Sequence, residues 1–579
     1  MVLLEQFEHL TLHPKNAARL KELVLQLAVQ GKLTQTWRNQ NPHVEPASEL
    51  LKRIEAEKAQ LVKEKKMKKE KPLEPISEEE ILDELPETWT WCRLGEAISF
   101  TNGYAFQSSS FTDEGIGIIR IGDLQNGEVV TQSMKYVDSD EFESLLQDFA
   151  AEPGAMLIAM SGATTGKIAV NNTSTTFLLN QRVGKIRPIL VNSLFLNSLL
   201  NTKIEENLRI SKGSAIPNLS TAQIKEIIFP LPPLAEQEAI VARVEELMQK
   251  IEELEKANQD RIQLQKSLGA AALQALTTAP DHELEQQWAF LQQHFQILFG
   301  QEANVKKLRE TILQLAVQGK LTSAWRRQNP TTQPAAHLLQ QIQAEKAQLV
   351  KDKKIKKEKP LEPISEDEVP YELPDSWVWC RLGEICLKVT DGTHHSPPNI
   401  EAGKYKYVTA KNIKNDGVLL SNITYVTEEI HQEIYSRCNP EKGDILYIKD
   451  GATTGIVTIN NLDEPFSMLS SVALLKLPKE VDNKFLLYLM RSPYFYEATR
   501  SGMSGVAITR VTLSKINYSL SPLPPLAEQE AIVAKVDQLM QLCDALEQQL
   551  AQANQQAEAL MQAVVQEALQ PQEEGVLEE

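Results

Sequence analysis

The chain has 579 residues, 42% of them hydrophobic and 24% charged, which is enough for several globular domains. Its net charge of −18 argues against a protein that binds DNA alone through phosphates, because such proteins usually present a basic surface. Either nucleic acid is not its partner, or a second protein supplies much of the cationic surface.

The chain is one unit written twice. Residues 26–38 recur at 314–326 and residues 56–80 recur at 344–368, both at a shift of 288 positions. The motif WCRLGE recurs at the same shift, GATTG at 289 and LPPLAEQ at 292. Insertions therefore accumulate only between WCRLGE and LPPLAEQ. The repeated frame is nearly identical in the two copies, while the segments between WCRLGE and LPPLAEQ differ. This favours one shared frame that carries two domains with different recognition specificities.

Each copy opens with a helical part. Apolar residues from Leu20 to Leu27 share one helical face, and Gly31 is the expected C-cap. A second helix is expected over about 47–70. The lysine run at 63–71 is either a solvated helix end or a segment that contacts phosphate.

A globule follows the helical part. Short β-like runs such as GIGIIRIGDL, GAMLIAM, KYKYVTA and GDILYIK, punctuated by Gly, Asn and Asp, predict a mixed α/β (α+β) fold. The predicted division is 1–85 for an N-terminal helical segment with a Lys-rich linker, 86–233 for the first globule, 234–373 for a central heptad helix and helical lead-in, 374–525 for the second globule, and 526–579 for a C-terminal heptad helix.

The third part of each copy is a heptad helix that begins at LPPLAEQ. The 18 residues from 231 to 248 match those from 523 to 540 at 15 positions. Apolar residues then alternate steps of four and three, which is typical of a coiled-coil seam. The seam residues in the first copy are Ile240, Val244, Leu247, Ile251 and Leu254, before the pattern blurs at Asn258. Those in the second copy are Ile532, Val536, Leu539, Cys543, Leu546, Leu550, Ala553, Ala557 and Leu560.

Two interpretations of the heptad helices are open. Each helix packs on its own domain, or the two helices pair with each other, because they are near-copies of one element. If the chain termini meet, two globules are held apart by two helical connectors with pseudo-two-fold symmetry. A helix of about 44 residues spans roughly 66 Å.

The duplicated LPPLAEQEAIV, the QLAVQGKLT-x-x-WR run, the LPxxWxWCRLGE openings and the GATTG segments resemble the specificity subunit (HsdS) of type I restriction–modification systems. The resemblance covers essentially the whole chain. It implies that each globule is a target recognition domain that reads one part of a bipartite, asymmetric sequence in double-stranded DNA. It implies that the repeated helices form a long antiparallel coiled coil that separates the two globules and sets the spacing. It also implies that these helices dock two methyltransferase subunits, which restriction subunits join in the full complex.

The resemblance also implies N6-adenine methylation by the partner and no catalytic centre in this chain. S-adenosylmethionine, ATP and Mg²⁺ are implied for the partner subunits, and no cofactor for this chain. The alternatives are a coiled-coil assembly scaffold that does not bind DNA, and a self-contained restriction–methylation enzyme. The chain lacks the NPPY-like or DPPY-like loop that an amino-methyltransferase needs, which argues against the second alternative.

The sequence patterns that suggest a phosphate-binding loop or a metal site are incomplete. SGATTGKIA differs from a phosphate-binding loop at two required positions, so a tight strand–turn–strand connection is favoured. A loop pair is favoured over a metal site at His394–His395, because no third ligand has suitable spacing. Five cysteines without a CxxC pair predict reduced thiols. No run of eighteen apolar residues and no signal-peptide pattern occurs, so we expect a cytoplasmic protein without membrane contact.

Candidate DNA-contacting residues lie in strand–loop segments of the globules. Such side chains are structural, contact phosphate, or hydrogen-bond base edges. The candidates are Arg120, Ser161, Thr164, Thr165, Lys167, Asn180, Gln181, Arg182, Lys212 and Asn218 in the first globule, and His394, His395, Lys411, Asn412, Lys449, Asp450, Thr453, Thr454 and Arg510 in the second. The first globule (86–233) has 11 basic and 15 acidic residues, and the second (374–525) has 16 of each, so tight binding is expected to need the partner.

Overall fold

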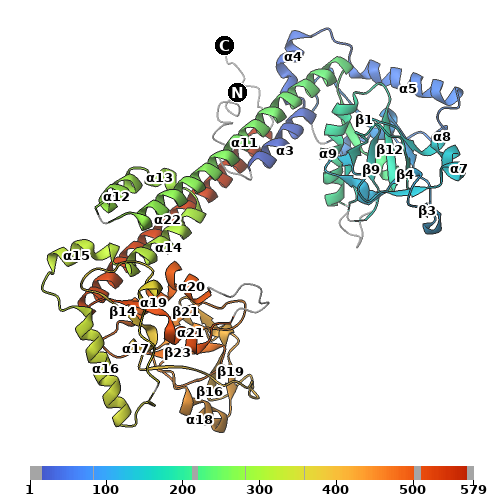
Figure 1. Ribbon diagram of the computed structural model, residues 1–579. Coiled ribbons are helices and arrows are strands. Elements are labelled where there is room, and N and C mark those ends of the chain that lie inside the picture. The colour runs from blue at the N-terminus through green and yellow to red at the C-terminus, as the bar shows by residue number, and fades with distance from the viewer. Residues whose placement is uncertain are drawn as a thin grey trace. The chain divides into compact units, whose positions relative to one another are not determined.

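The computed structural model describes residues 16–81, 84–162, 164–210, 219–280, 282–357, 359–500 and 510–569. The chain forms two compact units: unit 1 combines Met1–Asp260 with Asn554–Glu579, and unit 2 is Arg261–Ala553. Each unit contains one β-rich domain and part of two long helices, α11 (Leu234–Thr278) and α22 (Leu526–Leu569) (Figure 1). The predicted mixed α/β class is confirmed. None of the helices in the described part of the chain combines the length and apolarity that a membrane span requires.

The repeated frame forms the same short helices in both units. In unit 1 they are α3 (Asn16–Val29), η1 (Lys32–Thr34), α4 (Gln35–Gln40) and α5 (Ala47–Lys63). In unit 2 they are α14 (Glu302–Val317), η6 (Lys320–Thr322), α15 (Ser323–Gln328) and α16 (Ala335–Lys351), preceded by α12 (Leu284–Gln293) and α13 (Phe295–Leu298). The glycine expected to end α3 does so, because Gly31 has a φ of 71°.

The second frame helix is shorter than predicted. Helix α5 ends at Lys63, because Lys65 is left-handed with a φ of 58° and the Lys66 N–H bonds to the Leu61 carbonyl at 2.9 Å. This is a Schellman-type ending, which stops a helix where a glycine would be expected. Lys353, in the second copy, has a φ of 59°. Most of the lysine run therefore lies beyond the helix, in a turn and irregular chain.

The long helices run antiparallel to each other. In unit 1 the Lys32 ammonium donates to the carbonyls of Ala568 and Leu569, which end α22, while Thr34 bonds to Glu236 at the start of α11. The end of α22 therefore lies beside the start of α11. In unit 2 the Lys320 ammonium donates to carbonyls at the end of α11 in the same way, at 2.6 and 2.8 Å. The N-terminal lead-in therefore contacts the end of α22 in unit 1.

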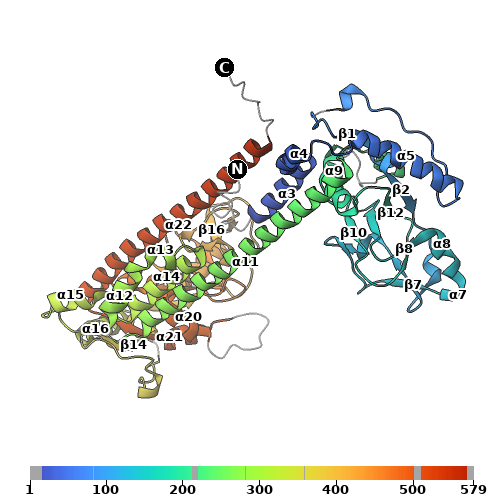
Figure 2. The ribbon, with the colours of Figure 1, turned by 90° about the horizontal axis from the view of Figure 1, so that it is seen from above.

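A third helix joins each pair. Figures 1 and 2 both show α3 alongside α11, and Lys21 pairs with Glu255 of α11 at 3.3 Å. In unit 2, Arg309 of α14 pairs with Asp544 and Glu547 of α22 at 2.5 and 3.0 Å. The predicted long helices are confirmed, but each end is a three-helix packing, because the lead-in helix covers the heptad seam.

The first domain is built from two main sheets and a short pair. The strand orders are β2-β12-β9-β10-β6-β5, β3-β7-β4-β11-β8 and β1-β13. The strands are β1 (Thr90–Arg93), β2 (Ile98–Asn102), β3 (Phe111–Thr112), β4 (Ile116–Ile119), β5 (Leu124–Gln125), β6 (Glu128–Val129), β7 (Lys135–Val137), β8 (Ala150–Ala151), β9 (Met156–Ala159), β10 (Ile168–Val170), β11 (Phe177–Leu179), β12 (Val183–Pro188) and β13 (Ile228–Leu231). The helices are α6 (Leu94–Ala97), α7 (Ser139–Phe142), α8 (Leu146–Phe149), α9 (Ser193–Ile210) and α10 (Thr221–Glu226).

The second domain repeats four adjacent strands of the six-stranded sheet, β2-β12-β9-β10, as β15-β23-β20-β21. Its orders are β15-β23-β20-β21, β19-β16-β22, β17-β18 and β14-β24. The strands are β14 (Val378–Arg381), β15 (Lys388–Asp391), β16 (Tyr405–Val408), β17 (Ile413–Lys414), β18 (Gly417–Val418), β19 (Thr424–Val426), β20 (Ile445–Ile448), β21 (Val457–Ile459), β22 (Ser467–Met468), β23 (Val472–Lys476) and β24 (Leu520–Leu523). The helices are α17 (Leu382–Ile385), α18 (Glu428–Arg437), α19 (Asn483–Arg491), α20 (Pro493–Arg500) and α21 (Leu513–Tyr518).

One buried glutamate in each unit joins three repeated motifs. In unit 1 the Glu236 carboxylate of LPPLAEQ is fully buried and accepts from Thr34 at 2.7 Å, Arg38 at 2.5 Å and the Trp89 indole at 2.8 Å. Buried charges must be paired and hydrogen-bonded, and three donors satisfy this one. The junction fixes the start of the long helix against the frame and the domain opening. Its counterpart in unit 2 is Glu528.

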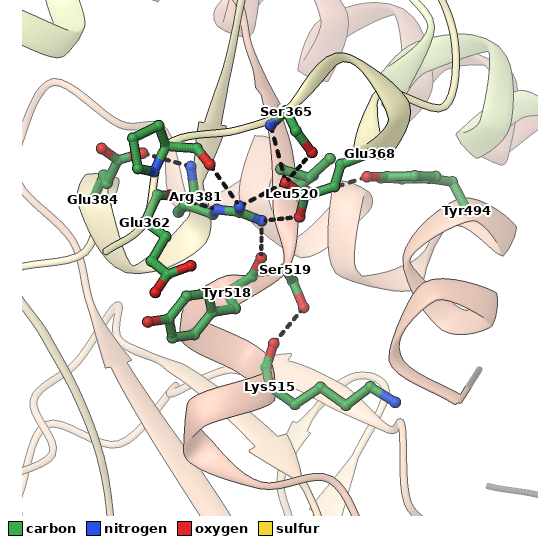
Figure 3. Close-up of polar contacts among 11 residues, drawn as sticks. Glu362, Ser365, Glu368, Arg381, Glu384, Tyr494, Lys515, Tyr518, Ser519 and Leu520 are labelled. Atoms are coloured by element: carbon green, nitrogen blue, oxygen red, sulfur yellow. Dashed lines mark hydrogen bonds and ion pairs between the residues drawn. The ribbon is translucent and has the colours of Figure 1, made fainter. Parts of the chain in front are cut away.

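The arginine of WCRLGE binds the KPLEPIS linker to the domain. Figure 3 shows the Arg381 guanidinium, which donates to both carboxylate oxygens of Glu368 at 2.8 and 2.9 Å. It also bonds to the carbonyls of Glu362, Pro363 and Tyr518 at 3.1 to 3.3 Å. The bonds that the Glu368 carboxylate accepts from Arg381 and from the Ser365 N–H lower its pKa to about 2. The linker is therefore a fixed part of the domain surface, which accounts for its near-identity in the two copies.

Candidate nucleic-acid interface

The GATTG segments are tight turns, as predicted, between β9 and β10 and between β20 and β21. Gly162 and Gly166 have φ angles of 83° and 85°, which favour glycine, and the Thr165 hydroxyl closes the turn onto the Gly162 carbonyl at 2.6 Å. In the second domain Thr454 makes the same bond to Gly451 at 2.7 Å. Thr165 and Thr454 thus hold the turns. Thr453 is exposed at the tip.

The residues before these turns occupy equivalent positions in the two domains. The Met160 N–H donates to the Arg182 carbonyl and the Lys449 N–H donates to the Ser471 carbonyl, both at 2.9 Å. The carbonyls of Met160 and Lys449 each accept a 2.8 Å bond from the returning chain. A glycine directly follows the neighbouring edge strand in each domain, Gly103 after β2 and Gly392 after β15. A Cβ at Gly103 or at Gly392 would lie 2.2 or 1.9 Å from a backbone oxygen.

In the second domain, charged side chains cluster around Lys449, the residue before the turn. We call the group the charged corner; it consists of Asp391, His394, Arg437, Lys449, Asp450 and Arg510. Asp391 ends β15 and Lys449 directly follows β20. Both strands run antiparallel to β23, so their carboxyl ends lie at the same edge of the sheet. The topology thus brings together residues that are 58 positions apart in the sequence.

The inner part of the charged corner is buried. The Lys449 and Asp391 side chains are each 2% exposed, and their charged atoms lie 3.5 Å apart. The Lys449 ammonium also donates to Asp450 at 3.0 Å. Asp450 in turn pairs with the Arg510 Nε at 3.2 Å, and the Arg510 side chain is 63% exposed. The charges therefore alternate from the interior to the surface.

The outer part of the charged corner lies on the opposite side of Asp391. The Arg437 guanidinium donates to Asp391 and lies 2.9 Å from the His394 Nε2. His394 also lies 3.5 Å from Asp391 and is half exposed. Because its ring faces a guanidinium, this histidine belongs to an ion-pair network. No group of three or more potential metal ligands occurs among the residues that the structure describes.

The equivalent corner of the first domain lacks the buried charges. Met160 stands in place of Lys449, the exposed Asn102 in place of Asp391, and Ser161 in place of Asp450. The Asn102 side chain accepts from the Thr221 hydroxyl at 3.1 Å. Arg182 is exposed beside this corner. The two domains therefore present different chemistry at the same place in one fold.

Arg120 and Asn412 belong to matching 3₁₀ turns. The buried Asp123 accepts from the Arg120 N–H at 2.8 Å, and burial raises the pKa of Asp123. Arg120 also bonds to the Ser133 carbonyl at 2.9 Å. The buried Asn412 amide accepts from the Thr409 N–H at 3.1 Å, so it stabilises the turn itself.

The other candidates fall into three groups. Exposed residues that remain candidates for contact with a partner are Lys167, Gln181, Arg182, His395 and Lys411. Side chains at the turn in the first domain, partly buried, are Ser161, Thr164 and Asn180, and the hydroxyls of Ser161 and Thr164 have no hydrogen-bond partner among the described residues. Lys212 and Asn218 lie outside the described residues.

Sequence reasoning missed Asp391 and Arg437. A signal for Asp391 was present, because the TDG that ends at Gly392 aligns with the TNG that ends at Gly103, at the shift of 289 that GATTG also has. No comparable signal marks Arg437, which comes from α18, a helix longer than its counterpart in the first domain.

The heptad residues pack against other parts of this same chain. Ile240, Val244, Leu247 and Ile251 are buried in a core shared with α3 and the first domain, and Ile532 and Val536 are buried in a core shared with α14. Cys543 is buried in the second of these cores, and four partly buried members pack against the same cores: Leu254, Leu539, Leu546 and Leu550. The seam prediction is wrong beyond Leu550, because Ala553 and Leu560 are exposed. A docking surface for another subunit must therefore use faces of the helices other than the seam.

All five cysteines are buried free thiols.

Comparison with known proteins identifies relatives over nearly the whole chain. The family described as the type I restriction modification DNA specificity domain matches residues 86–264 and 374–555. The EcoAI specificity subunit of Escherichia coli is 33% identical, over 94% of this chain and 93% of its own length. The EcoEI specificity subunit of the same organism is 31% identical, over 95% and 93%. A crystal structure of the HsdS subunit from Thermoanaerobacter tengcongensis, 19% identical, covers 84% of this chain and 98% of its own, with a TM-score of 0.41.

Proposed function

This chain belongs to the family of type I restriction–modification DNA specificity subunits, and from that premise we propose that its two domains read the two parts of an asymmetric, bipartite DNA sequence. The observation that carries the proposal is the contrast between the corners. One fold presents buried and exposed charges in the second domain, and neutral side chains with Arg182 in the first. Different donors and acceptors at the same place suit different bases.

The charge of the chain supports a shared DNA interface. The first domain has a net charge of −4 and the second has none, which is unlike a protein that binds DNA alone. We propose that two methyltransferase subunits complete the cationic surface and bind the same DNA. In this assembly the chain directs N6-adenine methylation, or restriction once restriction subunits join.

We propose that the partner subunits bind the outward faces of the long helices. Large apolar side chains on these helices are exposed, although the seam is buried or partly buried as far as Leu550, and exposed apolar clusters often mark protein interfaces. They are Leu264 (69% exposed), Leu268 (41%) and Leu542 (61%) in unit 2, and Leu560 (53%) in unit 1. Leu264 and Leu268 are four positions apart on α11, so they share a face.

The chemistry is proposed to belong to the partners. S-adenosylmethionine would bind the methyltransferase subunits, and ATP with Mg²⁺ the restriction subunits, while this chain supplies recognition and spacing. The buried charged network around Asp391 supports this division, because each of its carboxylates is held by a cation of the same domain.

Selection from a pool of random duplexes tests the function. The chain is used alone and together with its methyltransferase subunits, and bound DNA is sequenced. We expect two different short motifs at a fixed spacing, enriched when the partner is present. If neither sample enriches any motif, the domains do not read DNA, and the assembly-scaffold alternative holds.

A further inference from the structure

The turn that joins β11 to β12 in the first domain is held in place by its backbone. It consists of Asn180, Gln181 and Arg182. Three backbone hydrogen bonds connect it to other segments of the domain, and a fourth closes the turn itself. They join the Asn180 N–H to the Ile119 carbonyl at 3.0 Å, the Gln181 N–H to the Tyr104 carbonyl at 2.8 Å, the Met160 N–H to the Arg182 carbonyl at 2.9 Å, and the Val183 N–H to the Asn180 carbonyl at 2.8 Å.

The second domain holds the turn between β22 and β23 with the same four bonds. This turn consists of Leu469, Ser470 and Ser471. The bonds join the Leu469 N–H to the Val408 carbonyl at 3.1 Å, the Ser470 N–H to the Thr393 carbonyl at 2.8 Å, the Lys449 N–H to the Ser471 carbonyl at 2.9 Å, and the Val472 N–H to the Leu469 carbonyl at 3.1 Å. The two turns therefore occupy one position of a shared fold, at the sequence shift of 289 that GATTG also has.

The side chains on the turn differ between the domains. Gln181 and Arg182 are exposed, and neither side chain has a hydrogen-bond or ion-pair partner in the part of the chain that the structure describes. Ser470 and Ser471 at the same positions are short and half-buried. Because the fold accommodates serine at both positions, folding does not require the glutamine and the arginine. Their long polar side chains are available to a partner outside the chain.

Two neighbouring polar side chains on a fixed turn suit the recognition of bases. A glutamine amide offers a donor and an acceptor, as base edges do in the major groove, and it carries no charge to neutralise a phosphate. An arginine offers several donors to the acceptors of a base edge. A turn whose backbone is already fixed presents both side chains without the cost of ordering a loop on binding.

We propose that Gln181 and Arg182 determine the specificity of the first domain by contacting base edges in the part of the DNA sequence that this domain reads. The proposal rests on the proposed function and goes beyond it by assigning recognition to one turn of one domain. In the second domain, exposed arginines come from other segments: Arg437 is 50% exposed and Arg510 is 63% exposed. The two domains thus present long side chains from different segments of a shared fold.

Selection from random duplexes, with the full chain and its methyltransferase subunits, tests the proposal. The double variant Gln181→Ser, Arg182→Ser copies the residues of the second domain, so it preserves the turn. We expect it to lose the preference at one or two base pairs of one motif, with discrimination at each lowered on the order of 10- to 100-fold. The other motif and the spacing should stay unchanged.

Two further variants separate base contact from phosphate contact. Arg182→Lys keeps the charge but loses the planar fork of donors. It should lower discrimination at one of those base pairs and leave the salt dependence of binding unchanged. Arg187→Ser is the matched control, because Arg187 is also exposed and belongs to β12, but lies near the opposite end of that strand. It removes the same charge and should leave both motifs unchanged.

Three results overturn the assignment, and they differ from each other. If the double variant selects the same motifs as the wild type, the turn reads no base. If it weakens binding equally for all sequences and lowers the salt dependence by about one phosphate contact, Arg182 is a phosphate ligand. If the wild type with its partner enriches no motif, the proposed function fails and the assignment fails with it.

Discussion

Replacing Glu528 with glutamine tests the junction that joins three repeated motifs in unit 2. Its buried carboxylate accepts from Thr322 at 2.7 Å, Arg326 at 2.6 Å and the Trp377 indole at 2.9 Å. Glutamine has nearly the same shape, but it has no charge, and one of its terminal atoms is a donor. The variant therefore leaves the Arg326 guanidinium without its counter-ion and places an N–H group against another donor.

The expected cost is large for one substitution. Breaking a buried pair by removing one charged partner destabilises by about 3–5 kcal/mol. A folded domain is stable by about 5–15 kcal/mol. Glu528→Gln should therefore remove on the order of a third of the free energy of unfolding of unit 2.

Native-state hydrogen exchange of the full chain measures this effect locally. The amides of α14 and α15 should exchange with an opening free energy lowered by about 3–5 kcal/mol. Glu530→Gln makes the same charge change at an exposed position two residues further along α22 and should change it by less than about 0.5 kcal/mol. Equal opening free energies for the two variants would refute the view that the buried carboxylate stabilises the junction.

Two further predictions concern the partner surface and the linker. Leu264→Glu, on the exposed face of α11, should weaken association with the methyltransferase subunit at least tenfold in a binding titration. Gln263→Glu, at the adjacent exposed position, should leave the affinity unchanged. Equal affinities of the two variants would place docking elsewhere. Hydrogen bonds from Arg381 lower the pKa of Glu368 to about 2 from 4.5, so this pair stabilises the fold above pH 4.5 and the contribution is lost as the pH falls through about 2. The difference in urea midpoint between the wild type and Glu368→Gln should therefore be present at pH 7 and decline below pH 4.5, whereas exposed Glu366→Gln should show no such difference; a constant difference down to pH 2 would contradict the assignment.

Local patterns predicted the helices and the central strands well. Proline pairs, heptad spacing and Gly31 placed the starts and ends of elements that depend on nearby residues. The helix α5 was predicted too long, because its ending uses a left-handed Lys65 in place of a glycine, and composition does not reveal that conformation.

The candidate site was predicted in part. His394, Lys449, Asp450 and Arg510 were all candidates, because polar residues after strands are a local signal. The network that links them to Asp391 was not predicted, because it depends on two strands that lie antiparallel to β23 and end at one edge of the sheet.

By itself, the sequence determined that the chain is a duplicated frame with two divergent domains, since repeats and periodicity are properties of neighbouring residues. Only the tertiary structure decided how that frame is held together. The Glu236 carboxylate meets Thr34 and Trp89 across about 200 and 150 positions of sequence, and a buried charge is tolerated there only because folding brings its donors to it. The same reason applies to the charged corner, where a buried lysine in one domain and a methionine in the other occupy one position of a shared fold.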